Sequence, residues 1–209
     1  MEILKLSGNE GAASIRAAGV LRAGGVILYP TDTLYGLGAD AFSDTAVDKI
    51  YEIKSREPKK PTHAICSDMQ MVGEYAEINP AAQKLADTFF PGALTLILKK
   101  KSHVQDGIAR NMQTVGVRIP DNSFCIEVAR SLGKPFTATS ANLSGAAVVF
   151  SVQEILEQLD RSADLIDLVI DAGPLPMRPP STVVSLVGDA PAFLRVGAIP
   201  RSEIESVLG

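Results

Sequence analysis

The chain has 209 residues, of which 46% are hydrophobic and 21% are charged, and its formal net charge is −4. This composition fits a globular protein with a sizeable core, and the negative charge argues against sequence-independent binding of nucleic acid. The N-terminus lacks a signal-peptide pattern, and no apolar run approaches the roughly 18 residues of a membrane span. Cys66 and Cys125 are isolated, so we expect a cytoplasmic protein without a membrane span, a zinc site or a disulfide framework.

Helical and strand patterns alternate along most of the chain. Spacing and capping residues predict helices over residues 10–23, 44–54, 69–75, 80–89, 123–132, 152–159 and 200–208. Short apolar runs predict strands over residues 3–6, 26–29, 64–66, 94–98, 115–119, 136–139, 168–170, 182–187 and 192–196, and the last two read as a hairpin. We therefore expect a single α/β domain over residues 1–209, with a twisted mixed sheet and flanking helices.

A polar turn follows the strand predicted over residues 26–29. Pro30 fits the end of that strand, and three short polar residues, Thr31, Asp32 and Thr33, come next. Gly36 and Gly38 then allow the backbone to approach a neighbour closely. Ligands often lie beyond the carboxyl ends of strands in α/β sheets. The stretch is therefore either a ligand site or an ordinary strand followed by a turn and a glycine-rich exit. Asp32 itself either caps the turn or binds a metal ion.

Further polar clusters lie near other predicted element ends: Lys54 with Arg56, Arg118, the segment 139–142, and Ser181 with Arg195 close by in the last hairpin. Arginine binds phosphate or carboxylate through two hydrogen bonds, lysine acts as a point charge, and hydroxyl groups donate to phosphate oxygens. Each cluster has a simpler interpretation. Lys54 and Arg56 fit a solvated basic loop, and residues 140–145 fit an ordinary turn. Arg118, on the face of its strand opposite the valines, pairs either with a protein carboxylate or with a ligand.

Standard nucleotide and catalytic motifs are absent from the sequence. It has no G-x-x-x-x-G-K-[ST] and no G-x-G-x-x-G, which excludes a P-loop and a Rossmann phosphate site. The two histidines, His63 and His103, do not indicate a Ser–His–Asp triad.

Seven short motifs occur in a fixed order: Y-P-T-D-T-L-Y-G-L-G (29–38), K-S-R (54–56), P-G-A-L-T (91–95), V-R-I-P (117–120), T-S-A-N-L-S-G (139–145), P-S-T-V-V (180–184) and L-R-V-G (194–197). Together they resemble the YrdC/TsaC family, the threonylcarbamoyl-AMP synthases, from about residue 10 to the C-terminus. Any one motif is weak, but seven in order are specific. The longer relatives carry an extra C-terminal domain, so the chain resembles the short, single-domain form.

The resemblance implies a nucleotidyltransferase that converts L-threonine, bicarbonate and ATP, with Mg²⁺, into threonylcarbamoyl-AMP and pyrophosphate. A partner complex would then pass the threonylcarbamoyl group to adenosine 37 of tRNA. By the family pattern the threonine site comprises Thr31, Arg118, Ala138 and Ser181. The ATP site comprises Lys54, Arg56, Thr114, Ser140, Asn142, Ser151 and Arg195, of which Lys54 and Arg56 are the catalytic candidates, and no protein metal ligand is expected.

The chain departs from the family pattern in two places. In some relatives the strand after the K-x-R loop carries a histidine near the threonine site. Here that strand reads A-I-C-S (64–67) and His63 precedes it, so the role of that histidine is not assigned to His63. The segment 146–150 is unusually apolar, which bears on the assignment of Ser151. The alternative function is an RNA-binding module without ATP turnover, and weak RNA contact is possible in either case. A carbamoyl-phosphate enzyme of the hydrogenase-maturation type would need regions that this sequence lacks.

Overall fold

The computed structural model describes residues 1–56 and 62–209. Its strands form one ten-stranded sheet in the order β1-β8-β2-β3-β7-β4-β6-β5-β9-β10. They are β1 (Glu2–Lys5), β2 (Ile27–Pro30), β3 (Tyr35–Gly38), β4 (His63–Ile65), β5 (Leu94–Lys99), β6 (Thr114–Arg118), β7 (Phe136–Ser140), β8 (Leu168–Asp171), β9 (Thr182–Ser185) and β10 (Ala192–Arg195). Parallel pairs such as β1–β8 lie beside antiparallel pairs such as β2–β3, so the expected α/β class with a mixed sheet is confirmed.

Most of the helices begin after a residue whose side chain caps the first turn. The helices are α1 (Glu10–Arg22), α2 (Asp44–Ile53), α3 (Met69–Tyr75), α4 (Pro80–Phe89), α5 (Ser123–Leu132), α6 (Val152–Leu159) and α7 (Arg201–Leu208), with short 3-10 turns η1 (Gly107–Ala109) and η2 (Asp160–Leu165). Ser43, Asn79 and Ser151 each accept a hydrogen bond from a first-turn N–H group. Gly133 ends α5 with φ 77°, a conformation that glycine adopts without steric cost.

The polar turn of residues 31–34 is the tip of a β-hairpin. The expected glycine-rich exit is wrong, because residues 35–38 form β3, which pairs antiparallel with β2. Gly36 lies opposite Tyr29 in this pairing. A Cβ atom on Gly36 would lie 2.9 Å from the Tyr29 ring, so the glycine makes room for a large side chain on the neighbouring strand. The close approach that the sequence indicated is therefore made within the sheet.

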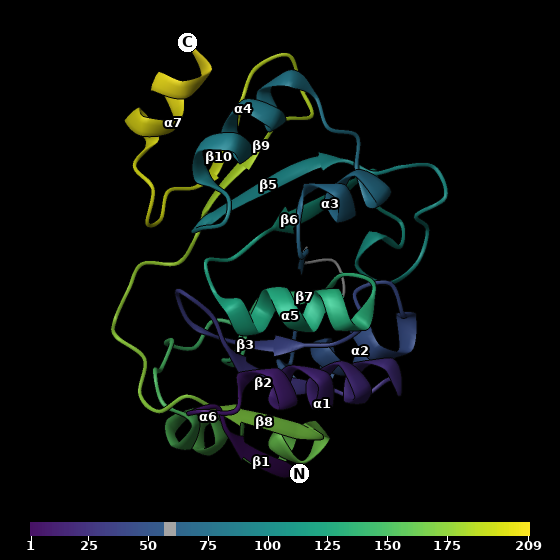
Figure 1. The fold of residues 1–209 in the computed structure, drawn as a ribbon, viewed down its shortest axis with the longest axis vertical. Coiled ribbons are helices and arrows are strands. Elements are labelled where there is room, and N and C mark those ends of the chain that lie inside the picture. Colours follow the sequence, from purple (N-terminus) through teal and green to yellow (C-terminus); the bar gives the residue numbers. More distant parts are fainter. Residues whose placement is uncertain (57–61) are drawn as a thin grey trace.

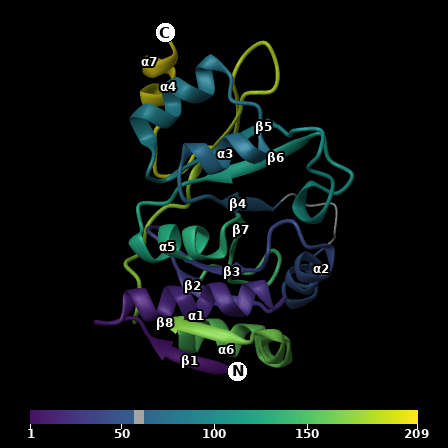
Figure 2. The same cartoon turned by 45° about the vertical axis from the view of Figure 1, so that its right-hand side comes forward.

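Helices cover both faces of the lower half of the sheet, from β1 to β7 (Figures 1 and 2). On one face α1 and α5 lie side by side, and α1 buries small residues such as Ala13, Ala17 and Ala18. On the other face α2 and α6 contribute a second core with Ile50 and Ile155. Small residues let the elements approach closely, and burial of their apolar surface stabilises the fold.

The upper half of the sheet, formed by β4, β6, β5, β9 and β10, has two faces of different character. Ala64 of β4, Val117 of β6 and Leu96 of β5 belong to the first hydrophobic core. The alternate residues of these strands, including His63 and Arg118, line a cavity instead, as the two-residue period of a strand requires. Among the described residues, no helix is long and apolar enough to cross a membrane.

Candidate active site

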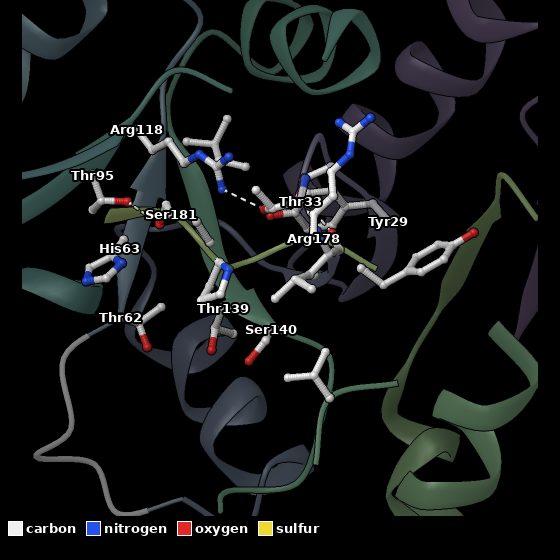
Figure 3. A pocket seen from close by; sticks show the side chains of 18 of the residues that line it. Tyr29, Thr33, Thr62, His63, Thr95, Arg118, Thr139, Ser140, Arg178 and Ser181 are labelled. Carbon is white, nitrogen blue, oxygen red and sulfur yellow. Dashed lines mark hydrogen bonds between the residues drawn. The ribbon is translucent and has the colours of Figure 1, made fainter. Parts of the chain in front are cut away.

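A cavity of about 290 Å³ lies on the face of the upper half of the sheet that carries His63 and Arg118. The β2–β3 turn, strands β4 to β7, and the segments around β9 and β10 form its walls (Figure 3). Seven of the predicted site residues line it: Thr31, Arg56, Arg118, Ala138, Ser140, Ser181 and Arg195. Residues predicted for the amino acid and residues predicted for the nucleotide therefore share one cavity.

The β2–β3 turn is built to hold Arg118. The Thr31 hydroxyl accepts hydrogen bonds from the backbone N–H groups of Thr33 (3.0 Å) and Leu34 (3.1 Å), which fixes the turn. Arg118 Nη2 then lies 2.7 Å from Asp32 Oδ1, and its Nη1 donates to Thr33 Oγ1 at 3.1 Å. Arg118 is only 7% exposed, so this is a buried ion pair. The sequence left two partners open for Arg118, a protein carboxylate or a ligand. The structure shows the protein carboxylate, Asp32, and Arg118 also lines the cavity where a ligand would bind.

Ser181 links two walls of the cavity. Its hydroxyl lies 2.9 Å from the Thr95 hydroxyl of β5, and Arg195 Nη2 donates to it at 3.0 Å. Arg195 Nε also donates to the Ser181 carbonyl at 3.0 Å. Burial and then the nearby Arg118 charge lower the pKa of Arg195, but a guanidinium remains charged in proteins. Arg195 therefore presents a fixed positive charge at the start of β9.

Arginine side chains dominate the charge of this cavity. Arg56 Nη1 donates to Thr139 Oγ1 at 3.3 Å, and burial lowers the pKa of Arg56. Arg178, which was not predicted, donates from the loop before β9 to the Asp32 carbonyl at 3.1 Å. With Arg118 and Arg195, four arginines line a single cavity in a chain of net charge −4. Such a concentration of positive charge favours a polyanionic ligand.

Comparisons with known proteins identify relatives of this chain. The family model named for Sua5, YciO and YrdC, described as telomere recombination, matches residues 19–197. A putative threonylcarbamoyl-AMP synthase of Methanocaldococcus jannaschii is 38% identical over 87% of this chain and 84% of its own length. The threonylcarbamoyl-AMP synthase of Bacillus subtilis is 37% identical over 93% of this chain. The chain belongs to the Sua5/YciO/YrdC family.

Solved structures of the same family share the fold. Sua5 of Pyrococcus abyssi in complex with L-threonine superposes with a TM-score of 0.90 and 33% identity over the whole chain. Escherichia coli YciO superposes with a TM-score of 0.81 and 27% identity over 95% of the chain. The chain spans 56% of the Bacillus subtilis protein and 60% of the Pyrococcus abyssi structure, so these two relatives are longer.

Lys54, predicted as catalytic in the family pattern, points into the protein. It is 2% exposed, and its Nζ donates to the carbonyl of Asn142 at 2.7 Å, to Asn142 Oδ1 at 3.3 Å and to the carbonyl of Ser140. Burial and then Arg56 lower the pKa of Lys54 to about 7. The simpler interpretation, a solvated basic loop, is therefore wrong for this residue. Lys54 fixes the 140–142 turn, while Lys59 and Lys60 of the same loop lie outside the described residues.

Three other predicted ATP-site residues lie outside the cavity walls. Asn142 is buried beneath Ser140 and donates from Nδ2 to the Ala146 carbonyl at 2.8 Å. Thr114 lies on β6 two residues before Gly116, on the same face as Arg118 but beyond the cavity. Ser151 forms the capping box of α6 with Glu154. The structure thus brings seven of the predicted residues together in the cavity lining, which does not include Lys54, Asn142, Thr114 or Ser151.

Sequence reasoning missed His63. We expected it before the strand, but β4 begins at His63, and its side chain lines the cavity with Ile65. The signal was the two-residue period of T-H-A-I-C-S, in which His63 and Ile65 share one face of the strand and Ala64 and Cys66 share the other.

Proposed function

We propose that the chain is a threonylcarbamoyl-AMP synthase, a nucleotidyltransferase that makes threonylcarbamoyl-AMP and pyrophosphate from L-threonine, bicarbonate and ATP. One observation carries the proposal. A single cavity joins a carboxylate-type site, with Arg118 and Ser181, to a phosphate-type site, with Arg56, Ser140 and Arg195. Relatives bearing this name match most of the chain, and the superposed Sua5 of Pyrococcus abyssi was solved with L-threonine.

The chemistry needs positioning and charge rather than a protein nucleophile. The amine of threonine attacks CO2 with loss of a proton, or bicarbonate with loss of water, to give a carbamate. A carbamate oxygen then attacks the α-phosphorus of ATP, and the bond to the leaving pyrophosphate breaks. Arg118 would hold the amino-acid carboxylate through its two-pronged guanidinium. Arg56 and Arg195 would offset negative charge on the phosphates as the transition state forms. Holding both substrates in one cavity supplies the orientation that such a transfer requires.

Mg²⁺ would enter with the nucleotide. Among the described residues, no group of three or more His, Cys, Asp or Glu side chains could hold a metal ion. Mg²⁺ would therefore depend mainly on the nucleotide for its ligands, because Mg²⁺ in nucleotide sites is commonly held by phosphates and few protein ligands. When bound, it would neutralise phosphate charge. The downstream transfer to tRNA through a partner complex, and location in the cytoplasm, stay predictions.

The deciding experiment is an adenylation assay. The protein is incubated with ATP, Mg²⁺, bicarbonate and labelled L-threonine, and both pyrophosphate and a labelled adenylate are measured. We expect pyrophosphate release to require threonine and bicarbonate together. Turnover that is unchanged without threonine would contradict the proposal. An RNA-binding module would instead shift RNA in a salt-sensitive manner without turnover.

A further inference from the structure

A polar residue interrupts the apolar run of strand β5. Leu94 and Leu96 belong to the first hydrophobic core, whereas Thr95 between them lines the cavity on the opposite face of the sheet. Thr95 ends the motif P-G-A-L-T (91–95), which contributes none of the predicted site residues. The pairing of β5 with β6 places Thr95 beside Arg118. Thr95 therefore lies next to the carboxylate-type part of the cavity.

The Thr95 hydroxyl has a single hydrogen-bond partner within residues 1–56 and 62–209. This partner is Ser181 Oγ, 2.9 Å from Thr95 Oγ1 (Figure 3). Thr95 is 1% exposed and Ser181 is 5% exposed, so the protein shields the pair from bulk water. Arg195 Nη2 donates to the same Ser181 Oγ at 3.0 Å. The Ser181 hydroxyl therefore has one charged donor and one hydroxyl neighbour.

Counting protons decides which hydroxyl of the pair donates. A hydroxyl group has one proton to donate and two lone pairs that accept. If Ser181 donated to Thr95, the Thr95 proton would be buried without an acceptor in the described part of the chain, and an unpaired buried donor is costly. If Thr95 donates instead, Ser181 accepts from both Thr95 and Arg195, and its own proton is left to point into the cavity. The second arrangement uses every donor.

We propose that Thr95 is a positioning residue: it donates to Ser181 Oγ and so directs the Ser181 proton toward the carboxylate of the amino-acid substrate. This inference rests on the proposed function. An ionised carboxylate can only accept hydrogen bonds, so Ser181 helps to bind it only with its proton facing the cavity. Arg118 donates to that carboxylate as well, and Thr95 itself touches no substrate. The pair thus orients a donor before the substrate arrives, which lowers the cost of binding.

Two substitutions at Thr95 separate the hydroxyl from the packing of the side chain. Thr95→Val keeps the branched shape and removes the hydroxyl, whereas Thr95→Ser keeps the hydroxyl. We expect Thr95→Val to raise the KM for threonine by about three- to tenfold, because the Ser181 proton is then free to turn away from the ligand. Thr95→Ser should restore the KM to within about twofold of the wild type. The affinity for ATP alone, measured by calorimetry, should change by less than about twofold in both variants.

Thr137→Val is the matched control. Thr137 of β7 is fully buried outside the cavity lining, and its hydroxyl donates to the Leu37 carbonyl and accepts from the Ala39 N–H group, both at 3.0 Å. Its loss should lower Tm and leave the KM for threonine within about twofold of the wild type. A rise in KM as large as that in Thr95→Val would show that any buried threonine hydroxyl has this effect, and would overturn the proposal.

A double-mutant cycle with Ser181→Ala tests whether Thr95 acts through Ser181. With the Ser181 hydroxyl removed, Thr95→Val should change the KM for threonine by less than about twofold. An equal increase in both backgrounds, or a wild-type KM in Thr95→Val alone, would overturn this inference while leaving the proposed function intact. A wild-type protein that neither binds threonine nor forms the adenylate would overturn the proposed function and this inference together.

Discussion

Arg118 and Asp32 form a buried ion pair in the cavity wall, with Nη2 2.7 Å from Oδ1. Their side chains are only 8% and 10% exposed. Arg118 Nε also donates to the Gly92 carbonyl at 3.1 Å, so the guanidinium is held from three sides. Asp32 thus orients an arginine that a ligand carboxylate can also approach, and the two carboxylates would share one cation.

Arg118→Lys should strongly weaken the use of threonine. A lysine ammonium is a point charge and cannot reproduce the planar fork that binds Asp32, Thr33 and a ligand carboxylate together. ATP binding without threonine should change little, because Arg56 and Arg195 remain. Separate titrations of ATP and threonine into the variant check this. Unaltered threonine affinity, or a loss confined to ATP, would place Arg118 in another site.

Asp32→Asn should destabilise the free protein and make it more responsive to ligand. Removing one partner of a buried ion pair leaves an uncompensated charge and typically costs about 3–5 kcal/mol. A ligand carboxylate can then take the place of the lost charge on Arg118. We therefore expect a lower Tm than in the wild type and a larger rise in Tm on adding threonine. Equal threonine-induced shifts in both proteins would show that Asp32 and the ligand do not share Arg118.

Arg56→Ala should damage ATP use far more than threonine binding. Arg56 lines the cavity beside Thr139, where a charge-assisted contact to a phosphate would be partly shielded from water. Its loss should reduce transition-state stabilisation by roughly 2–4 kcal/mol, read from kcat/KM for ATP. Arg110→Ala is the control, since Arg110 pairs with Asp48 outside the cavity. Wild-type kcat/KM in Arg56→Ala would support a solvated loop.

The sequence predicted the fold well because its signals are local. Caps such as Asn79 and the Ser151–Glu154 pair fixed helix starts, and apolar runs located most strands. β3 was missed because its two glycines read as a loop, although they make space for the Tyr29 ring and the Ile27 side chain on β2. Such a requirement arises from a neighbouring strand and is not visible within the segment itself.

The site was predicted less completely than the fold, because side-chain direction depends on packing. Arg118 was placed correctly on the face opposite the valines, since strand alternation alone decides it. Lys54 reads as a basic loop residue, yet α2 ends against the 140–142 turn and buries its ammonium group. His63 was missed because the strand was predicted to begin at residue 64, one residue later than β4 begins in the structure. Arg178 gave no signal, because a proline-rich loop has no period to orient it.

Lys54→Met should reveal a pH-dependent contribution to stability. In the folded protein burial and the Arg56 charge lower the pKa of Lys54 to about 7, from its ordinary value of 10.5. Between these values the unfolded chain holds a proton that the folded chain has lost, so the free energy of unfolding rises with pH. We expect wild-type stability, relative to Lys54→Met, to increase from pH 7 to 10 by at most about 1.4 kcal/mol per pH unit.

Loss of the Lys54 donor also removes a hydrogen bond from each of three oxygens in the 140–142 turn. The Ser140 carbonyl still accepts from the Asn142 N–H group at 3.0 Å, and Asn142 Oδ1 still accepts from the Ser140 hydroxyl at 2.6 Å. Among the described residues the Asn142 carbonyl is therefore the oxygen that loses its partner, and an unpaired buried group costs about 1–3 kcal/mol. The variant should be less stable than the wild type at pH 7 and should bind ATP more weakly through a loosened Ser140. Lys49→Met is the control, because Lys49 lies on the same helix and donates to the Gly24 carbonyl away from the cavity. Chemical denaturation of the three proteins at several pH values measures both effects. A stability difference between wild type and Lys54→Met that stays constant from pH 7 to 10 would show that Lys54 titrates as an ordinary lysine.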